Sequence, residues 1–273
     1  MRLGVSTAFR TDSADKWIAE HVDLGCKSVV FPLNCEDSET KIDGFAKAAK
    51  DNDVVIAEVG VWRNTLAADR EERNKMMDYA IGQLLLADKI GARCCVNVVG
   101  TPHGSRWDGG YAANFDKATR TEIVKMIQTI IDEAKPKNTK YSIEPMPWMV
   151  PTSPDDYLQL LEEVERDGFG VHLDLINMVT SPERYFNLNE FMDESFDKLG
   201  DKICSCHLKD ILLLEDFTFQ LRECACGEGI MDIKRYLDKA TSYDKDMPMI
   251  IEHLDNDEKY RASFKYVMEL INK

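Results

Sequence analysis

The chain has 273 residues, 44% of them hydrophobic, and its 49 acidic and 34 basic residues leave a formal net charge of −15 at pH 7. This balance argues against nucleic acid as a partner, because proteins that bind phosphate backbones carry an excess of Lys and Arg on one face. The N-terminal sequence MRLGVSTAFRTDSADK has no apolar signal segment, and no run approaches the roughly 18 apolar residues that span a bilayer. We therefore expect a cytoplasmic protein with no membrane partner.

Short apolar runs rich in β-branched residues recur along the chain and predict strands at 2–7, 28–32, 54–60, 93–99, 140–146, 170–176, 203–209 and 248–254. Helical patterns separate these runs. One buried helix face is indicated by the spacing of Ile123, Ile127, Ile130 and Ile131. Ser153 followed by Pro154 is typical of a helix start, and Gly168 is expected to end that helix. After the sixth run we expect a short turn near Pro182 and then a helix near 188–199.

Strands that alternate with helices pair in parallel through right-handed crossovers. Eight such units predict an α/β fold, a single (β/α)8 TIM barrel that forms one domain over residues 1–273. An open doubly wound sheet is the alternative. Such a sheet normally has a Gly-rich turn after its first strand, whereas here that strand leads into Ser6-Thr7-Ala8-Phe9.

The functional groups of such a barrel lie at the carboxyl ends of its strands. The last four predicted strands each end with one side chain that can bind a metal ion: Glu144, Asp174, His207 and Glu252. Strand alternation lets all four point into the barrel, because their neighbours are apolar: Ile143, Leu173, Leu175, Cys206, Leu208 and Ile251. Three carboxylates inside apolar strands are costly without a cation. One divalent ion therefore explains the set, and Mn²⁺, Mg²⁺, Co²⁺ and Zn²⁺ all suit its oxygen-rich shell.

Two readings without a metal stay open for these four side chains. They can line a water-filled barrel mouth, or the carboxylates can pair with Lys209 and Arg63.

The motifs that carry these residues are IEPMPW with Glu144, VHLDLIN with Asp174, CHLKD with His207, the G-x-G at 227–229 and IIEHL with Glu252. Over essentially the whole chain they resemble the xylose-isomerase-like TIM-barrel family of sugar and sugar-phosphate isomerases and epimerases. The resemblance implies that the four strand-end residues hold one divalent metal, most commonly manganese. It also implies that Glu144 and Glu252 are the acid/base residues on either face of a keto-sugar.

In this chemistry a proton leaves the carbon next to a carbonyl that the metal polarises. One glutamate removes that proton and the other returns one, either to the opposite face or to the neighbouring carbon. The resemblance therefore implies a metal-dependent epimerase or isomerase of carbohydrate metabolism.

The chain departs from the family pattern at two places. Asn177 stands where epimerases often carry a His, and Cys224-Ala225-Cys226 stands where many carry an Arg before the G-x-G, so a phosphorylated substrate is not supported. Within the family, EPMPW and RWDGG resemble a branch that acts on keto-glycosides. That branch includes C-glycoside deglycosidases, lyases that cleave C-glycosides of 3-keto sugars together with a small partner subunit. A lyase is therefore the alternative to an isomerase or epimerase.

Further candidates surround the predicted site. His103, in the Gly-rich loop after the fourth strand, is either an extra substrate ligand or base, or an exposed loop residue. Lys209 lies two residues after His207, so both side chains are expected on the same face of the strand. Lys209 is therefore expected to project to the rim and to bind sugar oxygens or a developing oxyanion. The residues considered as contacts to a small sugar or glycoside are Trp107, Trp148, Asn177, Arg63 and Glu58.

Two other functions share this fold or composition. A metal-dependent apurinic endonuclease is a remote alternative, because its trinuclear site uses many histidines and this chain has five. A sugar-binding module without catalysis is the other. The sequence leaves open whether the protein forms a homo-oligomer or requires a small partner subunit.

Overall fold

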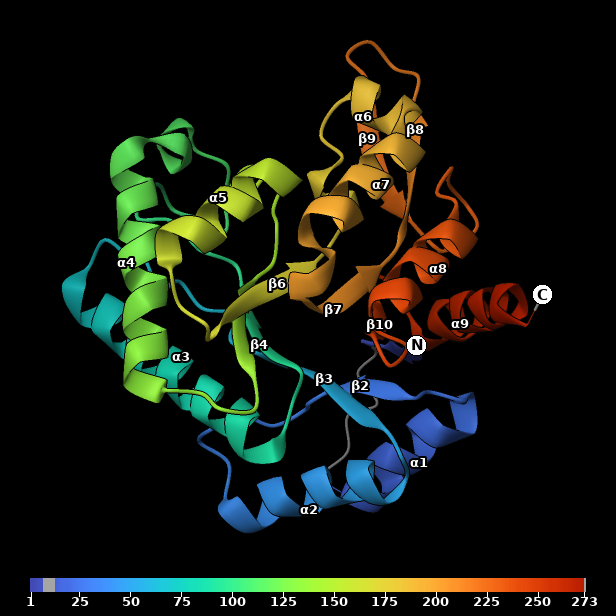
Figure 1. Cartoon of the computed structure of the whole chain (residues 1–273), viewed down its shortest axis with the longest axis horizontal. Helices are drawn as coiled ribbons and strands as arrows, with labels where there is room; N and C mark the ends of the chain where they lie inside the picture. Colours follow the sequence, from blue (N-terminus) through green and yellow to red (C-terminus); the bar gives the residue numbers. More distant parts are fainter. Residues whose placement is uncertain (7–12, 273) are drawn as a thin grey trace.

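The computed structural model describes residues 1–6 and 13–272, so residue 7 of the first predicted strand lies outside the described residues. Eight parallel strands form a sheet in the order β1-β10-β7-β6-β5-β4-β3-β2, with the helices around it (Figure 1). These strands are β1 (Arg2–Val5), β2 (Ser28–Val30), β3 (Val55–Gly60), β4 (Cys94–Asn97), β5 (Lys140–Ile143), β6 (Phe169–Leu173), β7 (Ile203–Leu208) and β10 (Pro248–Ile251). Each lies within or next to its predicted run.

The two ends of this sheet lie next to each other. The backbone N–H of Lys27, just before β2, donates a hydrogen bond to the carbonyl of Leu3 in β1 at 2.7 Å. The sheet is therefore a nearly closed TIM barrel, as predicted, and the open-sheet alternative is wrong.

The α-helices cover the outside of the barrel (Figure 1). They are α1 (Ala14–Leu24), α2 (Glu39–Asp51), α3 (Arg70–Ile90), α4 (Lys117–Ala134), α5 (Pro154–Val164), α6 (Pro182–Phe186), α7 (Leu188–Leu199), α8 (Ile233–Tyr243) and α9 (Asp257–Ile271). Short 3₁₀ turns are η1 (Ala112–Phe115), η2 (Ile176–Met178) and η3 (Gly200–Lys202). The isoleucine face of α4 is buried, as predicted. Among the described residues, no helix has the length and apolar character needed to cross a bilayer.

Helix α5 begins as predicted and ends earlier than predicted. Ser153 is its N-cap, with its hydroxyl accepting a hydrogen bond from the Asp156 amide at 3.1 Å, and Pro154 is its first residue. The helix ends at Val164 rather than near Gly168, because Glu165 adopts a left-handed backbone with φ of 49° and closes the helix itself.

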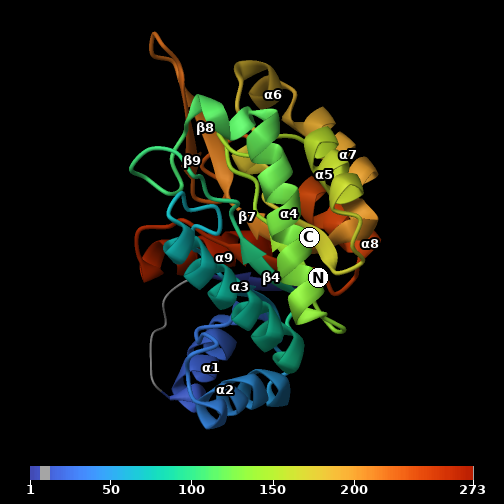
Figure 2. The same cartoon turned by 90° about the vertical axis from the view of Figure 1, so that its left-hand side faces the viewer.

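The sequence did not predict an antiparallel hairpin between β7 and α8. Its strands are β8 (Asp210–Leu214) and β9 (Gln220–Cys224), and they pair with each other rather than with the barrel. Figure 2 shows the hairpin projecting beyond the barrel. Its base is tied down by Asp210, whose buried carboxylate accepts hydrogen bonds from backbone amides of the G-x-G loop.

One tyrosine joins the helical layer to two barrel strands just below their carboxyl ends. The Tyr157 hydroxyl, on α5, donates to the carbonyl of Ile143 at 2.7 Å and accepts from the amides of Ile143 at 3.2 Å and His172 at 3.3 Å. Tyr157 is fully buried. This contact fixes the spacing of β5 and β6, the strands that lead into the first two predicted metal ligands.

Candidate functional site

The carboxyl ends of β5, β6, β7 and β10 bring the four predicted metal ligands together. Glu144 and Asp174 follow β5 and β6, His207 lies near the end of β7, and Glu252 follows β10. One ligand atom from each lies within 4.8 Å of the others, and all four side chains are buried. The Nδ1 atom of His207 lies 2.9 Å from Glu252 Oε2, 3.3 Å from Glu144 Oε1 and 3.8 Å from Asp174 Oδ2. We refer to these four residues as the quartet.

The pKa values of the three carboxyl groups of the quartet depend on burial and on the positive charges beside them. Burial raises the pKa of Glu144 to about 7. Burial alone would also raise the pKa of Glu252, but the charges of His207 and Lys209 outweigh it and lower that pKa to about 2. The same two cations hold the pKa of Asp174 well below its ordinary value in spite of burial. A buried set of converging carboxylates that depends on positive charge fits a divalent cation, and its three oxygens and one imidazole nitrogen suit a hard or borderline ion.

Lys209 lies inside this cluster and not at the solvent-exposed rim. Its Nζ atom is 2.6 Å from Glu252 Oε1, 2.7 Å from Asp174 Oδ2 and 3.3 Å from Glu223 Oε2, and the residue is 2% exposed. The prediction of a rim position was wrong, because the buried carboxylates attract the ammonium group inward. The predicted pairing of Lys209 with strand-end carboxylates is present.

A cavity of about 810 Å³ opens above the quartet, with Glu144 in its wall. Predicted contact residues Trp107, Trp148 and Asn177 line it, together with Trp62, Met146, Ile176, Val179, Ile211, Phe219, Leu221, Arg222, Glu223 and His253. Val98, Pro147, Arg106, Asp108 and Thr180 complete the lining, so the cavity combines aromatic and aliphatic side chains with charged and polar ones.

Asn177 connects two members of the quartet. Its backbone amide donates to Asp174 Oδ1 at 3.0 Å, and its side-chain Nδ2 donates to Glu144 Oε1 at 3.1 Å and to the carbonyl of Pro145 at 3.0 Å. The sequence predicted Asn177 as a substrate contact, and the structure adds that it orients Glu144.

Glu58 lies deeper than the sequence predicted. It is 2% exposed, and its Oε2 atom is 3.4 Å from His207 Nε2 and 3.6 Å from His172 Nδ1. The expected contact to a substrate at the rim was wrong, because Glu58 lies within β3, which continues to Gly60.

Arg63 and His103 lie away from the cavity lining. The guanidinium of Arg63 lies 5.0 Å from the ring centre of Tyr79 on α3, and Nη1 donates to the carbonyl of Trp62. The stacking on Tyr79 directs Arg63 into a separate surface depression, contrary to the prediction. The backbone amide of His103 donates a hydrogen bond to Thr101 Oγ1. His103 is not among the described residues that line the cavity. Its Nε2 atom is buried.

The sequence did not identify the paired side chains of His253 and Glu223 as part of the site. His253 Nδ1 lies 2.9 Å from Glu223 Oε2, and both residues line the cavity. Strand alternation after Glu252 would point His253 away from the barrel interior, but a left-handed backbone with φ of 57° turns it toward the cavity. Glu223 belongs to the unpredicted hairpin, so no sequence pattern placed it there.

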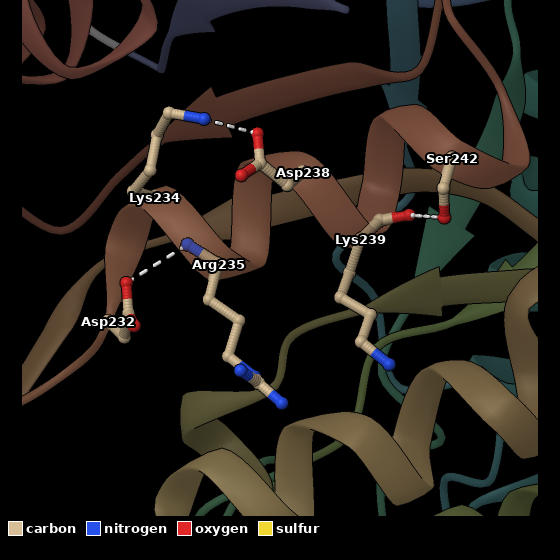
Figure 3. A pocket seen from close by; sticks show the side chains of 6 residues that line it. All are labelled: Asp232, Lys234, Arg235, Asp238, Lys239 and Ser242. Atoms are coloured by element: carbon tan, nitrogen blue, oxygen red, sulfur yellow. Dashed lines mark hydrogen bonds and ion pairs between the residues drawn. The ribbon is translucent and has the colours of Figure 1, made fainter. Parts of the chain in front are cut away.

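A second depression, of about 590 Å³, runs along α8 (Figure 3) and is lined by Asp232, Lys234, Arg235, Asp238, Lys239 and Ser242. Lys234 pairs with Asp238 at 2.5 Å, and Arg235 and Lys239 both pair with Asp193 on α7. Because each of these cations has a carboxylate partner, we assign no ligand to this depression.

Comparison with solved structures shows similar barrels. A magnesium complex of a xylose isomerase-like TIM barrel protein from Mycobacterium smegmatis is 18% identical, with a TM-score of 0.70, and the match covers 94% of this chain and 89% of the other. The 3-keto-D-glucoside 4-epimerase of E. coli is 12% identical, with a TM-score of 0.69 and coverage of 98% and 99%. The probable 3-DHS dehydratase of petrobactin synthesis from Bacillus anthracis is 16% identical, with a TM-score of 0.75 and coverage of 100% and 99%. At these identities the likeness shows the fold alone.

No curated protein matches the chain. The sequence model described as the xylose isomerase-like TIM barrel matches residues 18–270, which is most of the chain. The family resemblance predicted from the strand-end motifs is thereby confirmed, and the chain belongs to the xylose isomerase-like TIM barrel family.

Proposed function

We propose that this protein is a divalent-metal-dependent sugar isomerase or epimerase that removes a proton next to the carbonyl of a keto-sugar or keto-glycoside. The observation that carries the proposal is the convergence of Glu144, Asp174, His207 and Glu252 within 4.8 Å beside a cavity of about 810 Å³. The family and its epimerase relatives support a sugar isomerase or epimerase. The apurinic endonuclease is disfavoured, because the quartet contains a single histidine.

The quartet would hold the metal, which supplies Lewis-acid polarisation of a substrate carbonyl when it is bound. The remaining chemistry belongs to the protein. Glu144, which faces the cavity, and Glu252 exchange protons with the substrate as a pair of acid and base. Lys209 lies 2.6 Å from Glu252 Oε1 and keeps that carboxylate anionic. Asn177 holds Glu144 Oε1 in place.

The cavity favours a substrate larger than a free sugar. Its volume lies within the range of roughly 300–1,000 Å³ that encloses ligands of drug size. The aromatic faces of Trp107 and Trp148 suit the C–H surface of a sugar ring or an apolar substituent. We therefore propose a keto-glycoside as substrate. The structural likeness to a 3-keto-D-glucoside 4-epimerase supports this choice.

Exchange of the substrate α-proton with deuterium tests the proposal. The purified protein is stripped with EDTA and incubated in D₂O with 3-keto-glucosides and free keto-sugars, with and without Mn²⁺, Mg²⁺, Co²⁺ or Zn²⁺, and exchange is followed by NMR. We expect metal-dependent exchange that Glu144→Gln abolishes and that Glu162→Gln, at an exposed position of α5, leaves intact. Absence of a bound divalent metal together with absence of exchange on all of these substrates would point to a sugar-binding module instead.

A lyase is the second candidate, favoured by the aromatic and aliphatic side chains that line the cavity. The same proton removal, followed by loss of an aglycone, cleaves a C-glycoside of a 3-keto sugar, and those side chains would hold the aglycone. Release of the aglycone, measured by chromatography, distinguishes a lyase from an epimerase. A homo-oligomer and a small partner subunit remain predictions, and size-exclusion chromatography with light scattering tests the first of them.

A further inference from the structure

The two ring nitrogens of His207 face opposite parts of the barrel interior. Nδ1 faces the quartet, 2.9 Å from Glu252 Oε2 and 3.3 Å from Glu144 Oε1. Nε2 faces downward to Glu58, 3.4 Å from Oε2 and 3.5 Å from Oε1. The histidine is thus held between two groups of carboxylates with different surroundings.

Glu58 has no access to solvent or to the substrate cavity. It is 2% exposed and lies within β3, whereas the quartet residues lie at or just beyond the ends of their strands. An imidazole that binds a metal ion through one nitrogen is neutral and keeps one proton, on its other nitrogen, and a carboxylate can only accept a hydrogen bond from that N–H. Glu58 therefore favours the form with the proton on Nε2, which leaves the lone pair of Nδ1 facing the quartet.

His172, the other imidazole close to Glu58, already has a hydrogen-bond partner. His172 Nδ1 lies 3.6 Å from Glu58 Oε2 but 2.6 Å from the hydroxyl of Ser205, its hydrogen-bond partner. His172 and His207 meet edge to face, with ring centres 4.1 Å apart, so His172 packs against the ring and limits its rotation.

We propose that Glu58 is a positioning residue that fixes His207 as an Nδ1 ligand of the metal. This inference rests on the metal site of the proposed function and adds to it a group that touches neither metal nor substrate. Buried carboxylates behind metal-bound histidines set the orientation and tautomer of the ring, and their loss typically weakens metal affinity by about 10–100-fold.

A different arrangement would use the same atoms. Glu58, His172 and His207 themselves offer three ligand atoms within 4.8 Å and could hold a second cation. Nε2 of His207 cannot both donate a hydrogen bond to Glu58, which needs a proton on the nitrogen, and bind an ion, which needs its lone pair. The two arrangements therefore differ in the number of metal ions bound per chain.

Magnesium binding to the full chain tests the proposal, because Mg²⁺ is diamagnetic and permits NMR. The variants are Glu58→Ala, Glu58→Gln and, as an exposed control, Glu162→Gln. The amide oxygen of Glu58→Gln can still accept a hydrogen bond from Nε2–H. Isothermal titration calorimetry gives affinity and stoichiometry, and ¹⁵N NMR of labelled histidine gives the tautomer of His207. Thermal melting and circular dichroism establish that each variant is folded.

In the unmodified protein we expect one Mg²⁺ per chain and, with Mg²⁺ bound, a neutral His207 that is protonated on Nε2. Glu58→Ala should bind Mg²⁺ about 10–100-fold more weakly and lose the single tautomer. Glu58→Gln should retain the tautomer and lose less affinity. An Ala variant that is folded and keeps both affinity and tautomer overturns this inference while the metal site stands, and so does binding of two ions per chain. A complete lack of Mg²⁺ binding by the unmodified protein overturns the metal site itself and this inference with it.

Discussion

The side-chain amide of Asn177 donates a hydrogen bond to Glu144 Oε1 at 3.1 Å and so links the segment after β6 to the end of β5. Its second hydrogen bond, to the carbonyl of Pro145, fixes the direction of the amide group. Glu144 also borders the cavity, so the orientation of its carboxylate bears directly on what a substrate meets there.

Removal of this link should slow the reaction without unfolding the protein. A hydrogen bond to a charged group contributes about 1.5–3 kcal/mol, so Asn177→Ala should lower kcat/KM for α-proton exchange by roughly 10–100-fold. The measurement is the NMR exchange assay, with circular dichroism to establish folding. Asn74→Ala, at an exposed position of α3, is the control. An unchanged kcat/KM would show that Glu144 is oriented without Asn177.

Divalent metal should stabilise the folded protein, because the quartet converges only in the native state. At a concentration 100 times the Kd, a ligand that binds only the folded state adds about 2.7 kcal/mol. For a chain of this size that raises Tm by about 5–10 °C. Differential scanning calorimetry with Mg²⁺ and with EDTA measures the shift, and Asp174→Asn should abolish most of it. Equal Tm values under both conditions would contradict a metal at the quartet.

Loss of the Asp210 carboxylate should destabilise the G-x-G loop. One oxygen accepts from the amides of Ile211 at 2.8 Å and Met231 at 2.9 Å, and the other from those of Gly227 at 3.1 Å and Gly229 at 3.0 Å. In Asp210→Asn an NH₂ group must face two of these donors, which leaves buried amides unsatisfied at a cost on the order of 3 kcal/mol.

Urea denaturation measures the effect of Asp210→Asn as a lower transition midpoint. Asp216→Asn, on the exposed turn of the hairpin, should stay within about 0.5 kcal/mol of the unmodified protein. If both variants unfold at the same urea concentration, the loop does not depend on the Asp210 carboxylate.

Tyr157→Phe removes the hydroxyl that joins α5 to β5 and β6. The amides of Ile143 and His172 then lose an acceptor in a site without solvent access. We expect a loss of about 1–3 kcal/mol in the free energy of unfolding, measured in urea. Tyr243→Phe, at a residue that is 38% exposed, is the matched control and should change stability by less than about 0.5 kcal/mol. A Tyr157→Phe variant that unfolds at the same urea concentration as the unmodified protein would show that the buried hydroxyl contributes nothing to stability.

The sequence predicted the barrel and the quartet for the same reason. Parallel strands bring their carboxyl ends to one face, so the positions of Glu144, Asp174, His207 and Glu252 follow once the strands are found. Glu58 was predicted only as a substrate contact, and strand alternation does not say how far along the strand the barrel mouth lies. The predicted position of Glu58 at the rim was therefore wrong, and its side chain lies buried below the barrel mouth.

Other parts of the site depend on features that strand periodicity does not contain. The direction of His253 depends on a single left-handed residue, and Lys209 was drawn inward by carboxylates from neighbouring strands. The charged pair Lys209-Asp210 separates the strand run from the apolar residues 211–214, but nothing in this pattern indicates that the second run pairs with residues 220–224 outside the barrel. The contribution of Glu223 to the cavity could not be predicted without that hairpin.

The hairpin has a consequence for how this protein can acquire new substrates. Its two strands pair with each other and not with the barrel, yet they supply Phe219, Leu221, Arg222 and Glu223 to the cavity wall. Because the strands pair only with each other, we expect changes of sequence or length within residues 212–220 to leave the register of the barrel strands unchanged. Part of the wall that a substrate meets thus lies on a segment outside the barrel, and selection can change that part while Glu144, Asp174, His207 and Glu252 are preserved.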